Sequence, residues 1–289
     1  MLTRSIGVRL AAAVVVGGSA LLTSCSPGAS HPAQPSTFHV TPFRASDFVD
    51  PRVGANPWFP LLPGTQWVRQ GTTLIGNRVV PYEVITTVTD VTRTIKGVPT
   101  VLSYDVSMGA GQVVQESLDY FALDRSGNVW DLGSVTEQYE AGRFVAVDEA
   151  WLAGVDGATA GILMPGNPRT APPWLIAKPP GEKGDAAAFA RMQPQQCVPF
   201  GCYKDVLVIE EGKRDALNNE FKYYVRGAGQ IRDESLSGSH HFDNERLINL
   251  RMLSPQGLAE ASAAALRIDR EAVKEAPEVF GTVRASRAP

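Results

Sequence analysis

The chain has 289 residues, of which 44% are hydrophobic and 20% are charged, and its formal net charge is −3. Its lysine and arginine residues are scattered, which argues against a polybasic surface for nucleic acid or anionic lipid. The length is enough for one large domain or two small ones with a sizeable core.

The start of the chain has the layout of a secretory signal. Arg4 and Arg9 precede an apolar run at residues 10–22 that is too short and too interrupted by glycine to span a bilayer comfortably. The run ends in Leu-Thr-Ser-Cys at residues 22–25, which resembles the lipobox of bacterial lipoproteins. The resemblance implies removal of residues 1–24 and a diacylglycerol on the Cys25 thiol, which would anchor the protein to the extracytoplasmic side of the cell membrane. A plain signal peptide that happens to contain Cys25 is the alternative.

Residues 25–56 are rich in proline, serine, alanine and threonine and have few regular hydrophobic positions. Such a composition is typical of a tether that lifts a domain off a membrane. We therefore expect a β domain over residues 57–253, followed by a helix and tail over residues 254–289.

The first strands are marked by β-branched and aromatic residues. Residues 79–89 and 100–106 have this composition and are separated by a predicted turn at Lys96-Gly97. Residues 118–123 and 129–132 flank the sequence Asp-Arg-Ser-Gly-Asn, which predicts a hairpin with glycine at the position of positive φ. A Ca²⁺ loop is the alternative for this turn, but the later carboxylate that such a loop requires is missing.

The second half of the domain resembles the first. Glu116 and Glu220, and likewise Tyr120 and Tyr224, recur at a constant spacing of 104 residues at corresponding places in apolar strands. We expect two related meanders, at about residues 57–149 and 150–253, unless the similarity is chance. Because antiparallel meanders must pair or cover their edges, the predicted fold is mainly β: a barrel, half-barrel or sandwich with a C-terminal helix.

Two cysteines remain once Cys25 is assigned to lipid. Cys197 and Cys202 flank Val-Pro-Phe-Gly, and outside the cytoplasm such a close pair is most simply a disulfide. A redox or metal pair is the alternative. A metal site would need further ligands, and the adjacent His240 and His241 would point to opposite faces of an extended chain.

A helix is predicted after residue 253. Ser254 at the N-cap and Pro255 at the first helical position begin it, alanine-rich sequence continues it to residue 272, and Pro277 ends it. Its apolar stripe consists of Leu258, Ala261, Ala265 and Ile268. We expect the stripe to cover a barrel mouth or sheet edge. A membrane-surface helix is the alternative, although the opposite face carries both signs of charge.

No motif predicts a catalytic residue, a metal ligand or a cofactor site. The nucleophile elbow, the zinc-protease motif and the dinucleotide fingerprint are all missing. Ser239, His241 and Asp243 are triad residue types, but alternating residues of one segment cannot meet as a triad. The adjacent carboxylates Glu210-Glu211, Asp148-Glu149 and Asp233-Glu234 could serve a glycosidase only if folded opposite one another, and solvated strand ends explain them equally well.

Four short sequence segments are similar to those of a widespread group of exported bacterial proteins of undefined function. They lie at residues 56–67, 124–130, 165–169 and 223–231. The resemblance covers most of the β domain but implies no activity. Cys197, Cys202 and the Pro-Pro-Trp run at residues 172–174 depart from it.

Three functions are compatible with these features. The first is an accessory protein of the cell envelope that binds another protein by a sheet face or edge. The second is a carrier or sensor of an apolar ligand or envelope lipid, favoured by the spread of five tryptophans, although these are typical core residues: Trp58, Trp67, Trp130, Trp151 and Trp174. The third is a hydrolase of envelope polymers, which is supported only by scattered carboxylates and the histidine pair. The sequence predicts no nucleic-acid partner.

Overall fold

The computed structural model describes residues 38–53, 55–75, 78–213, 216–235, 244–281 and 285–287. The proposed lipid site Cys25 and the predicted signal lie outside these residues. So do Ser239, His240, His241 and Asp243.

Strands make up most of the described chain. They are β1 (Phe48–Val49), β2 (Thr65–Ile75), β3 (Arg78–Ile95), β4 (Val98–Gly109), β5 (Gln112–Asp124), β6 (Val129–Glu140), β7 (Arg143–Leu152), β8 (Thr159–Met164), β9 (Trp174–Lys178), β10 (Asp185–Val198), β11 (Gly201–Lys213), β12 (Ala216–Val225), β13 (Gly229–Ser235), β14 (Arg246–Met252) and β15 (Ser286–Arg287). The helices are the short 3₁₀ helix η1 (Ala45–Asp47), α1 (Pro255–Glu275) and α2 (Pro277–Phe280).

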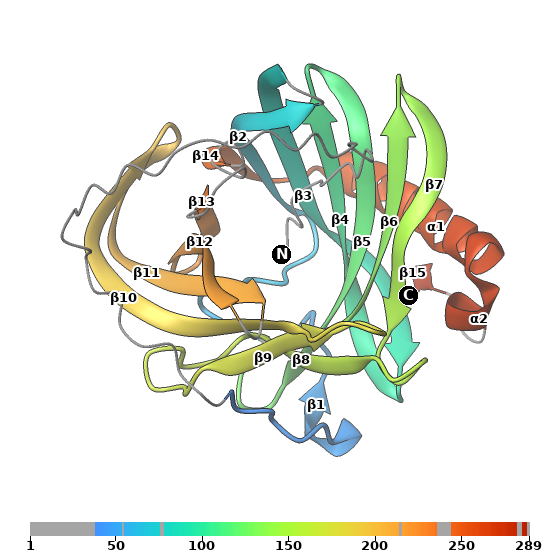
Figure 1. Cartoon of the computed structure of the whole chain (residues 1–289), viewed down its shortest axis with the longest axis horizontal. Helices are drawn as coiled ribbons and strands as arrows, with labels where there is room; N and C mark the ends of the chain where they lie inside the picture. The colour runs from blue at the N-terminus through green and yellow to red at the C-terminus, as the bar shows by residue number, and fades with distance from the viewer. Residues whose placement is uncertain are drawn as a thin grey trace, which may run out of the picture.

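The strands form one antiparallel sheet that closes on itself (Figure 1). Its order runs β5-β4-β3-β2-β14-β13-β12-β11-β10-β9-β8-β6, and β6 also pairs with β5, so that twelve described strands form a ring. β1, β7 and β15 are added outside the ring on β5, β6 and β3. Among the predicted β architectures, the closed barrel is therefore confirmed.

The predicted hairpins are confirmed. Lys96 and Gly97 join β3 to β4 with φ values of 50° and 77°, conformations for which glycine is suited. In the turn between β5 and β6, the Asp124 carboxylate accepts the backbone N–H groups of Ser126 and Asn128 at 2.8 and 2.9 Å and the indole N–H of Trp130 at 2.8 Å. These bonds use the carboxylate as a turn cap, in agreement with the hairpin.

The four sequence segments that resemble exported bacterial proteins meet at one end of the ring. The side-chain amide of Asn56 donates to the carbonyls of Gly127, Met164 and Pro165 at 2.7, 3.2 and 3.2 Å. In the fourth segment, residues 223–231, the Gly227 N–H donates to the Pro57 carbonyl at 2.8 Å. The segment after Asn56 packs Phe59 against the ring of Phe121, at 5.3 Å between centroids. These four segments therefore build a structural junction that fills one end of the barrel interior.

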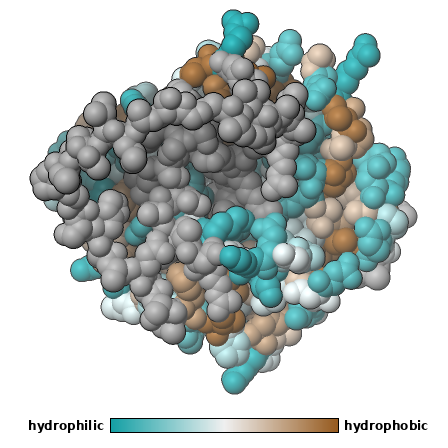
Figure 2. Space-filling model, in the orientation of Figure 1, coloured by the Kyte–Doolittle hydropathy of each residue, from teal (hydrophilic) through white to brown (hydrophobic). Residues whose placement is uncertain are grey.

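Helix α1 begins and ends as predicted, but its position differs from the expectation. The Ser254 hydroxyl caps the Gly257 N–H at 3.2 Å, and the helix ends at Glu275, just before Pro277. It lies across the outer face of the sheet, not over a mouth or edge (Figure 1). A buried ion pair of 2.5 Å between Asp269 and Arg93 of β3 explains this position, because the apolar stripe alone does not specify which surface it covers. The surface at this side carries hydrophilic residues with hydrophobic ones among them (Figure 2).

The expected tether is too long at its C-terminal end. His39 exchanges backbone hydrogen bonds with Pro173 and Leu175, at 2.7 and 3.2 Å. Phe43 and Phe48 pack on each other at 5.0 Å between ring centroids, and both contact the Trp130 ring. These two aromatic residues bury the chain against the barrel in spite of its tether-like composition. Residues 25–37 of the expected tether lie outside the described part of the chain.

The division into two related halves stays a prediction. Both halves contribute to one ring, since β2 pairs with β14 and β6 pairs with β8. The residues matched by the spacing have different partners: Glu116 binds Arg267 of the outer helix at 2.5 Å, whereas Glu220 binds the buried Lys222 at 3.0 Å. The spacing therefore does not transfer a side-chain role from one half to the other.

Candidate functional site

The interior of the barrel is lined by polar side chains. On β5, Glu116 and Tyr120 contact α1 on the outside, so Ser117, Asp119 and Phe121 point into the ring. Cross-strand pairing carries this inner face around the neighbouring strands. One row runs Thr86, Asp105, Ser117, Thr136 and Glu149, and the next runs Ser103, Asp119, Ser134 and Trp151.

Four carboxylates, Asp105, Asp119, Asp131 and Glu149, lie on four adjacent strands of this inner face and are called the carboxylate wall below. A cavity of about 40 Å³ adjoins it, lined by Asp119, Asp131 and Glu149 together with Phe121, Trp151 and several hydroxyl side chains. The Trp151 indole N–H donates to Glu149 at 3.0 Å, which orients the ring beside the carboxylate. The cavity is large enough for ordered water.

Burial makes ionisation of two members of the carboxylate wall, Asp105 and Asp131, unfavourable. Desolvation, with the neighbouring charge of Asp119, raises the pKa of Asp105 to about 8. Desolvation and Asp119 also raise the pKa of Asp131 well above its ordinary value, although a hydrogen bond from the Gly133 N–H, at 3.1 Å, opposes the shift. Carboxyl groups perturbed in this way are typical of functional sites.

The wall formed by β11, β12 and β13 holds a buried ammonium group. Lys222 lies 2.9 Å from the carboxylate of Glu211 and 3.0 Å from that of Glu220, and it has no solvent exposure. Desolvation opposes its charge, but Glu211, Glu220 and Asp233 outweigh it and raise the pKa of Lys222 well above the ordinary value. Desolvation likewise raises the pKa of Glu220 and of Asp233.

A third group of polar residues joins these two walls. Arg69 of β2 binds Glu245 at 3.1 Å and donates to the Thr86 hydroxyl at 2.9 Å. A second cavity, of about 20 Å³, adjoins Arg69 and is lined also by Phe59, Trp67 and Gln230. The interior charges therefore extend around the ring from β11, through β13 and β2, to β7.

Several buried polar atoms of this band have no hydrogen-bond partner among the described residues. They include Asp105 Oδ1, the Tyr224 hydroxyl and Gln230 Oε1, on residues that are 6%, 0% and 6% exposed. An unsatisfied buried polar group costs about 1–3 kcal/mol, and native proteins keep few of them. Such atoms mark positions where water or a ligand completes the structure.

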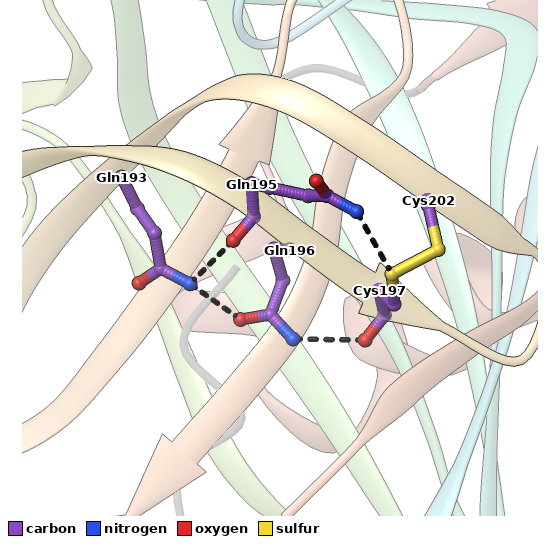
Figure 3. Close-up of a disulfide and its surroundings, with 5 residues drawn as sticks. All are labelled: Gln193, Gln195, Gln196, Cys197 and Cys202. Atoms are coloured by element: carbon purple, nitrogen blue, oxygen red, sulfur yellow. Dashed lines mark hydrogen bonds between the residues drawn. A yellow bond between two sulfur atoms is a disulfide. The ribbon is translucent and has the colours of Figure 1, made fainter.

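The disulfide Cys197–Cys202 is present in the structure (Figure 3). It joins directly opposed residues of β10 and β11, with Cα atoms 4.0 Å apart, next to the turn at Pro199 and Phe200. Gln196 donates to the Cys197 carbonyl at 2.8 Å. The predicted disulfide is therefore confirmed. No group of three or more metal-ligating side chains occurs among the described residues.

Strand β7 is an edge strand of the described sheet. It pairs with β6 alone among the described strands, and register shifts show bulges near Val145 and Asp148. The side chains of Phe144 and Val145 are 41% and 52% exposed. Bulges protect an edge from indiscriminate pairing, while exposed apolar residues beside a free backbone favour contact with another chain.

The interior site was not predicted from the sequence. Asp105, Asp119 and Asp131 belong to no motif. Of the two explanations open for Glu211 and Asp233, solvated strand ends do not fit, because these residues are 0% and 1% exposed. The alternation Ser-Tyr-Asp-Val-Ser at residues 103–107 was an available signal, since it puts the polar residues on one face of a strand. The five tryptophans are buried, as core residues should be.

The chain matches no protein-family model, and no curated protein matches it. A solved structure that is similar to it is that of a suspected exported protein with a YmcC-like fold from Bacteroides fragilis, with 11% sequence identity and a TM-score of 0.34. The match covers 68% of this chain and 100% of that chain. In the described part of the chain, no helix has the length and apolar character needed to cross a membrane.

Proposed function

We propose that this protein is a membrane-anchored, exported lipoprotein of the cell envelope that binds a small polar ligand inside its barrel, without catalysis. The unsatisfied atoms of Asp105, Tyr224 and Gln230 are the observation that carries the proposal. A fold that has retained buried polar atoms at a cost in stability departs from simple packing rules, and such departures concentrate at functional sites.

The chemistry of the cysteines supports the cellular location. The sequence at residues 22–25 resembles a lipobox, and the disulfide Cys197–Cys202 suits an oxidising compartment outside the cytoplasm. We expect Cys25→Ala to move the protein from the membrane fraction to the soluble extracytoplasmic fraction, because it removes the acylated thiol. Fractionation followed by immunoblotting measures this, and Cys197→Ala is the matched control. Unchanged membrane retention of Cys25→Ala would contradict the proposed anchor.

The polarity of the interior argues against an apolar ligand. A lipid chain placed beside Asp119, Asp131 and Glu149 would remove the water that solvates these groups and would offer no hydrogen bonds in return. The position of the carboxylates also gives little support to a polymer hydrolase, because an intact polymer would have to thread into a closed ring of strands. A small polar molecule meets neither difficulty.

Native mass spectrometry of the soluble Cys25→Ala protein, purified gently from an exporting host, tests the proposed function. We expect excess mass that is released on denaturation and extracts into water. A mass that extracts as lipid would replace the proposal by an apolar carrier. A clean apo mass that stays unchanged after incubation with polar extracts of the envelope would contradict ligand binding altogether.

Strand β7 supports a second candidate, binding of an envelope protein. We propose an extended segment of that protein as the partner, paired with the free backbone of β7 and packed on Phe144 and Val145. A photo-crosslinker at Val145 should trap one defined partner in cells, and Ala146→Pro should abolish the product by removing a backbone donor. The same crosslinker at Val79, which is 49% exposed, is the control. Equal products from both positions would contradict a specific edge.

A further inference from the structure

The buried lysine in the wall formed by β11, β12 and β13 has the surroundings of a covalent cross-link. We propose that Lys222 and Glu211 become joined by an intramolecular amide bond, and that Glu220 carries the proton that this reaction moves. The modification is independent of any ligand bound in the barrel, and it concerns how the folded chain is held together.

The three side chains meet on two adjacent strands. Glu211 of β11 is directly opposite Glu220 of β12, and Lys222 lies two residues further along β12, on the same face of the sheet. The Lys222 Nζ atom is 2.9 Å from Glu211 Oε2 and 3.0 Å from Glu220 Oε1. Because a carboxyl oxygen is bonded to its carbon, Nζ is also close to the Glu211 carboxyl carbon. Reacting atoms need to approach to about 3–3.5 Å, so little movement separates this arrangement from reaction.

The contact between Lys222 and Glu211 is close, but it does not satisfy the carboxylate. Neither carboxyl oxygen of Glu211 has a hydrogen-bond partner among the described residues, and both side chains are buried. A buried ion pair whose lone pairs are not satisfied by hydrogen bonds carries a desolvation cost that its attraction does not repay. An amide bond would replace both charges by one neutral group and remove this cost.

The surroundings of this pair are shielded from water. Ile209, which is opposite Lys222 on β11, is fully buried, as are Lys222 and Glu211 themselves. None of these residues lines either of the two interior cavities described above. Amide formation releases one water molecule, and a dry site both favours its departure and hinders the reverse hydrolysis.

Glu220 is placed to take a proton from the lysine and to return it. Lys222 is held as an ammonium group, and only a neutral amine attacks a carboxyl carbon. Burial raises the pKa of Glu220, which makes its carboxylate a better acceptor for the Nζ proton. A C–N bond then forms at the Glu211 carboxyl carbon and one C–O bond breaks. The two protons lost by Nζ end on the departing oxygen as water, and Glu220 returns to its original state. The reaction is redox-neutral and occurs once per chain, so it needs no high rate.

The cross-link would add to the effect of the disulfide. The Cys197–Cys202 bond ties β10 to β11, and a bond between Glu211 and Lys222 would tie β11 to β12. Two covalent bonds would then hold three consecutive strands of the ring. Thiol exchange opens only the first of them, so an amide would keep β11 and β12 joined under reducing conditions.

Tryptic peptide mapping of the soluble Cys25→Ala protein, reduced and denatured before digestion, tests the bond. Trypsin cleaves after free lysine, and an amide removes the charge that it recognises. We therefore expect the peptide of residues 205–213 to be joined to that of residues 215–226, with no cleavage after Lys222. The joined species should weigh one water less than the two peptides together. Fragmentation should place the bond on Glu211 and not on the adjacent Glu210.

Two variants test the role of the neighbouring carboxylates. Glu220→Gln should lose the joined peptide and restore cleavage after Lys222, because an amide side chain cannot accept the proton. Glu210→Gln is the matched control and should keep the joined peptide, since Glu210 lies opposite Phe221 on the other face of the sheet. Circular dichroism and melting curves select the variants that keep the native fold.

The parent protein alone can overturn the proposal. Complete cleavage after Lys222, with both peptides at their unmodified masses, would show that the buried contact is an ordinary ion pair. A bond that maps to Glu220 or Asp233 would overturn the assignment to Glu211. A joined peptide that persists in Glu220→Gln would overturn the role given to Glu220. None of these results depends on whether a ligand occupies the barrel.

Discussion

The side chain of Asp105 shows how burial in the barrel interior makes folding stability depend on pH. Its pKa of about 8 lies above the ordinary value near 3.8, because the folded protein desolvates it beside Asp119. Between about pH 4 and pH 8, the folded state therefore keeps a proton that the unfolded chain has already lost. Stability from this group is complete below pH 4 and is lost as the pH rises toward 8.

We expect Asp105→Asn to make the protein more stable than the parent at pH 8 and to flatten the loss of stability across this range. The amide cannot ionise, so a contribution on the order of a few kcal/mol no longer varies with pH. Urea unfolding at pH 5, 6, 7, 8 and 9 measures the change. Ser107→Ala, on the same inner face of β4, is the control. Parallel pH profiles for Asp105→Asn and the parent would refute the raised pKa.

The position of Asp105 also shows where sequence reasoning stops at this scale. The pattern at residues 103–107 separates polar from apolar residues, but a strand pattern does not say which face of the strand is enclosed. Polar faces usually meet solvent, which is why solvated strand ends are one explanation of Glu211 and Asp233 from the sequence. In a closed ring with a helix on its outside, the inner face is the polar one.

At the scale of elements, α1 is attached to the sheet by charges of unequal burial. Asp269 pairs with Arg93 where both side chains are at most 2% exposed, and it also accepts from the Tyr120 hydroxyl at 3.1 Å. Arg267 pairs with Glu116 and Glu137 but is 42% exposed. Removing a partner from a buried pair leaves a charge without compensation, whereas a half-exposed arginine can be replaced by water.

We therefore expect Asp269→Ala to lower the unfolding free energy by about 3–5 kcal/mol. Arg267→Ala should cost less, about 1–2 kcal/mol, because Arg267 is 42% exposed and the Tyr139 hydroxyl still donates to the buried Glu137. Urea titrations followed by far-UV circular dichroism compare the two variants. Equal losses would show that burial does not distinguish these ion pairs.

The β10–β11 hairpin should depend little on its disulfide. Cys197 and Cys202 close a short loop, which restricts the unfolded chain by about 2 kcal/mol at most. The hairpin is also held by the hydrogen bond from the Phe200 N–H to the Leu247 carbonyl, at 3.1 Å. We expect the Cys197→Ser/Cys202→Ser double variant to lose no more than about 2 kcal/mol in urea. A loss of 4 kcal/mol or more would mean that the bond supports structure beyond the hairpin.

The elements themselves were the most predictable level. Ser254 and Pro255 mark the start of α1, and glycine in the turns after β3 and β5 marks the hairpins, because capping and positive φ leave local signals. The surface covered by the helix was not predictable, since it depends on the distant pairing of Arg93 with Asp269. The docking of residues 39–53 was missed because two phenylalanines outweigh the surrounding composition.

At the scale of the whole molecule, closure depends on strands that are distant in sequence. Trp67 of β2 is opposite Leu250 of β14, and this seam is what distinguishes a barrel from a half-barrel or a sandwich. The sequence predicted these three alternatives and could not choose among them, because local patterns carry no information on which distant edges pair.

Gly71 tests that seam. A Cβ built on it would lie 1.8 Å from the backbone oxygen of Asn244, so β2 and the segment before β14 could not stay in contact. We expect Gly71→Ala to destabilise the protein by several kcal/mol and to increase amide exchange in β2 and β14 before other strands. Gly201→Ala is the control, since the nearest side-chain atom is 4.0 Å from its added Cβ. Normal exchange in Gly71→Ala would contradict the tight seam.

The docking of the chain from His39 onward sets how far the barrel can rise from a membrane. Thirteen residues lie between the proposed acylated Cys25 and His39, and this stretch, fully extended, would reach at most about 50 Å. The barrel would therefore sample a thin layer next to the lipid headgroups. A soluble ligand would have to diffuse into that layer, and molecules fixed in the outer parts of a thick envelope would be out of range.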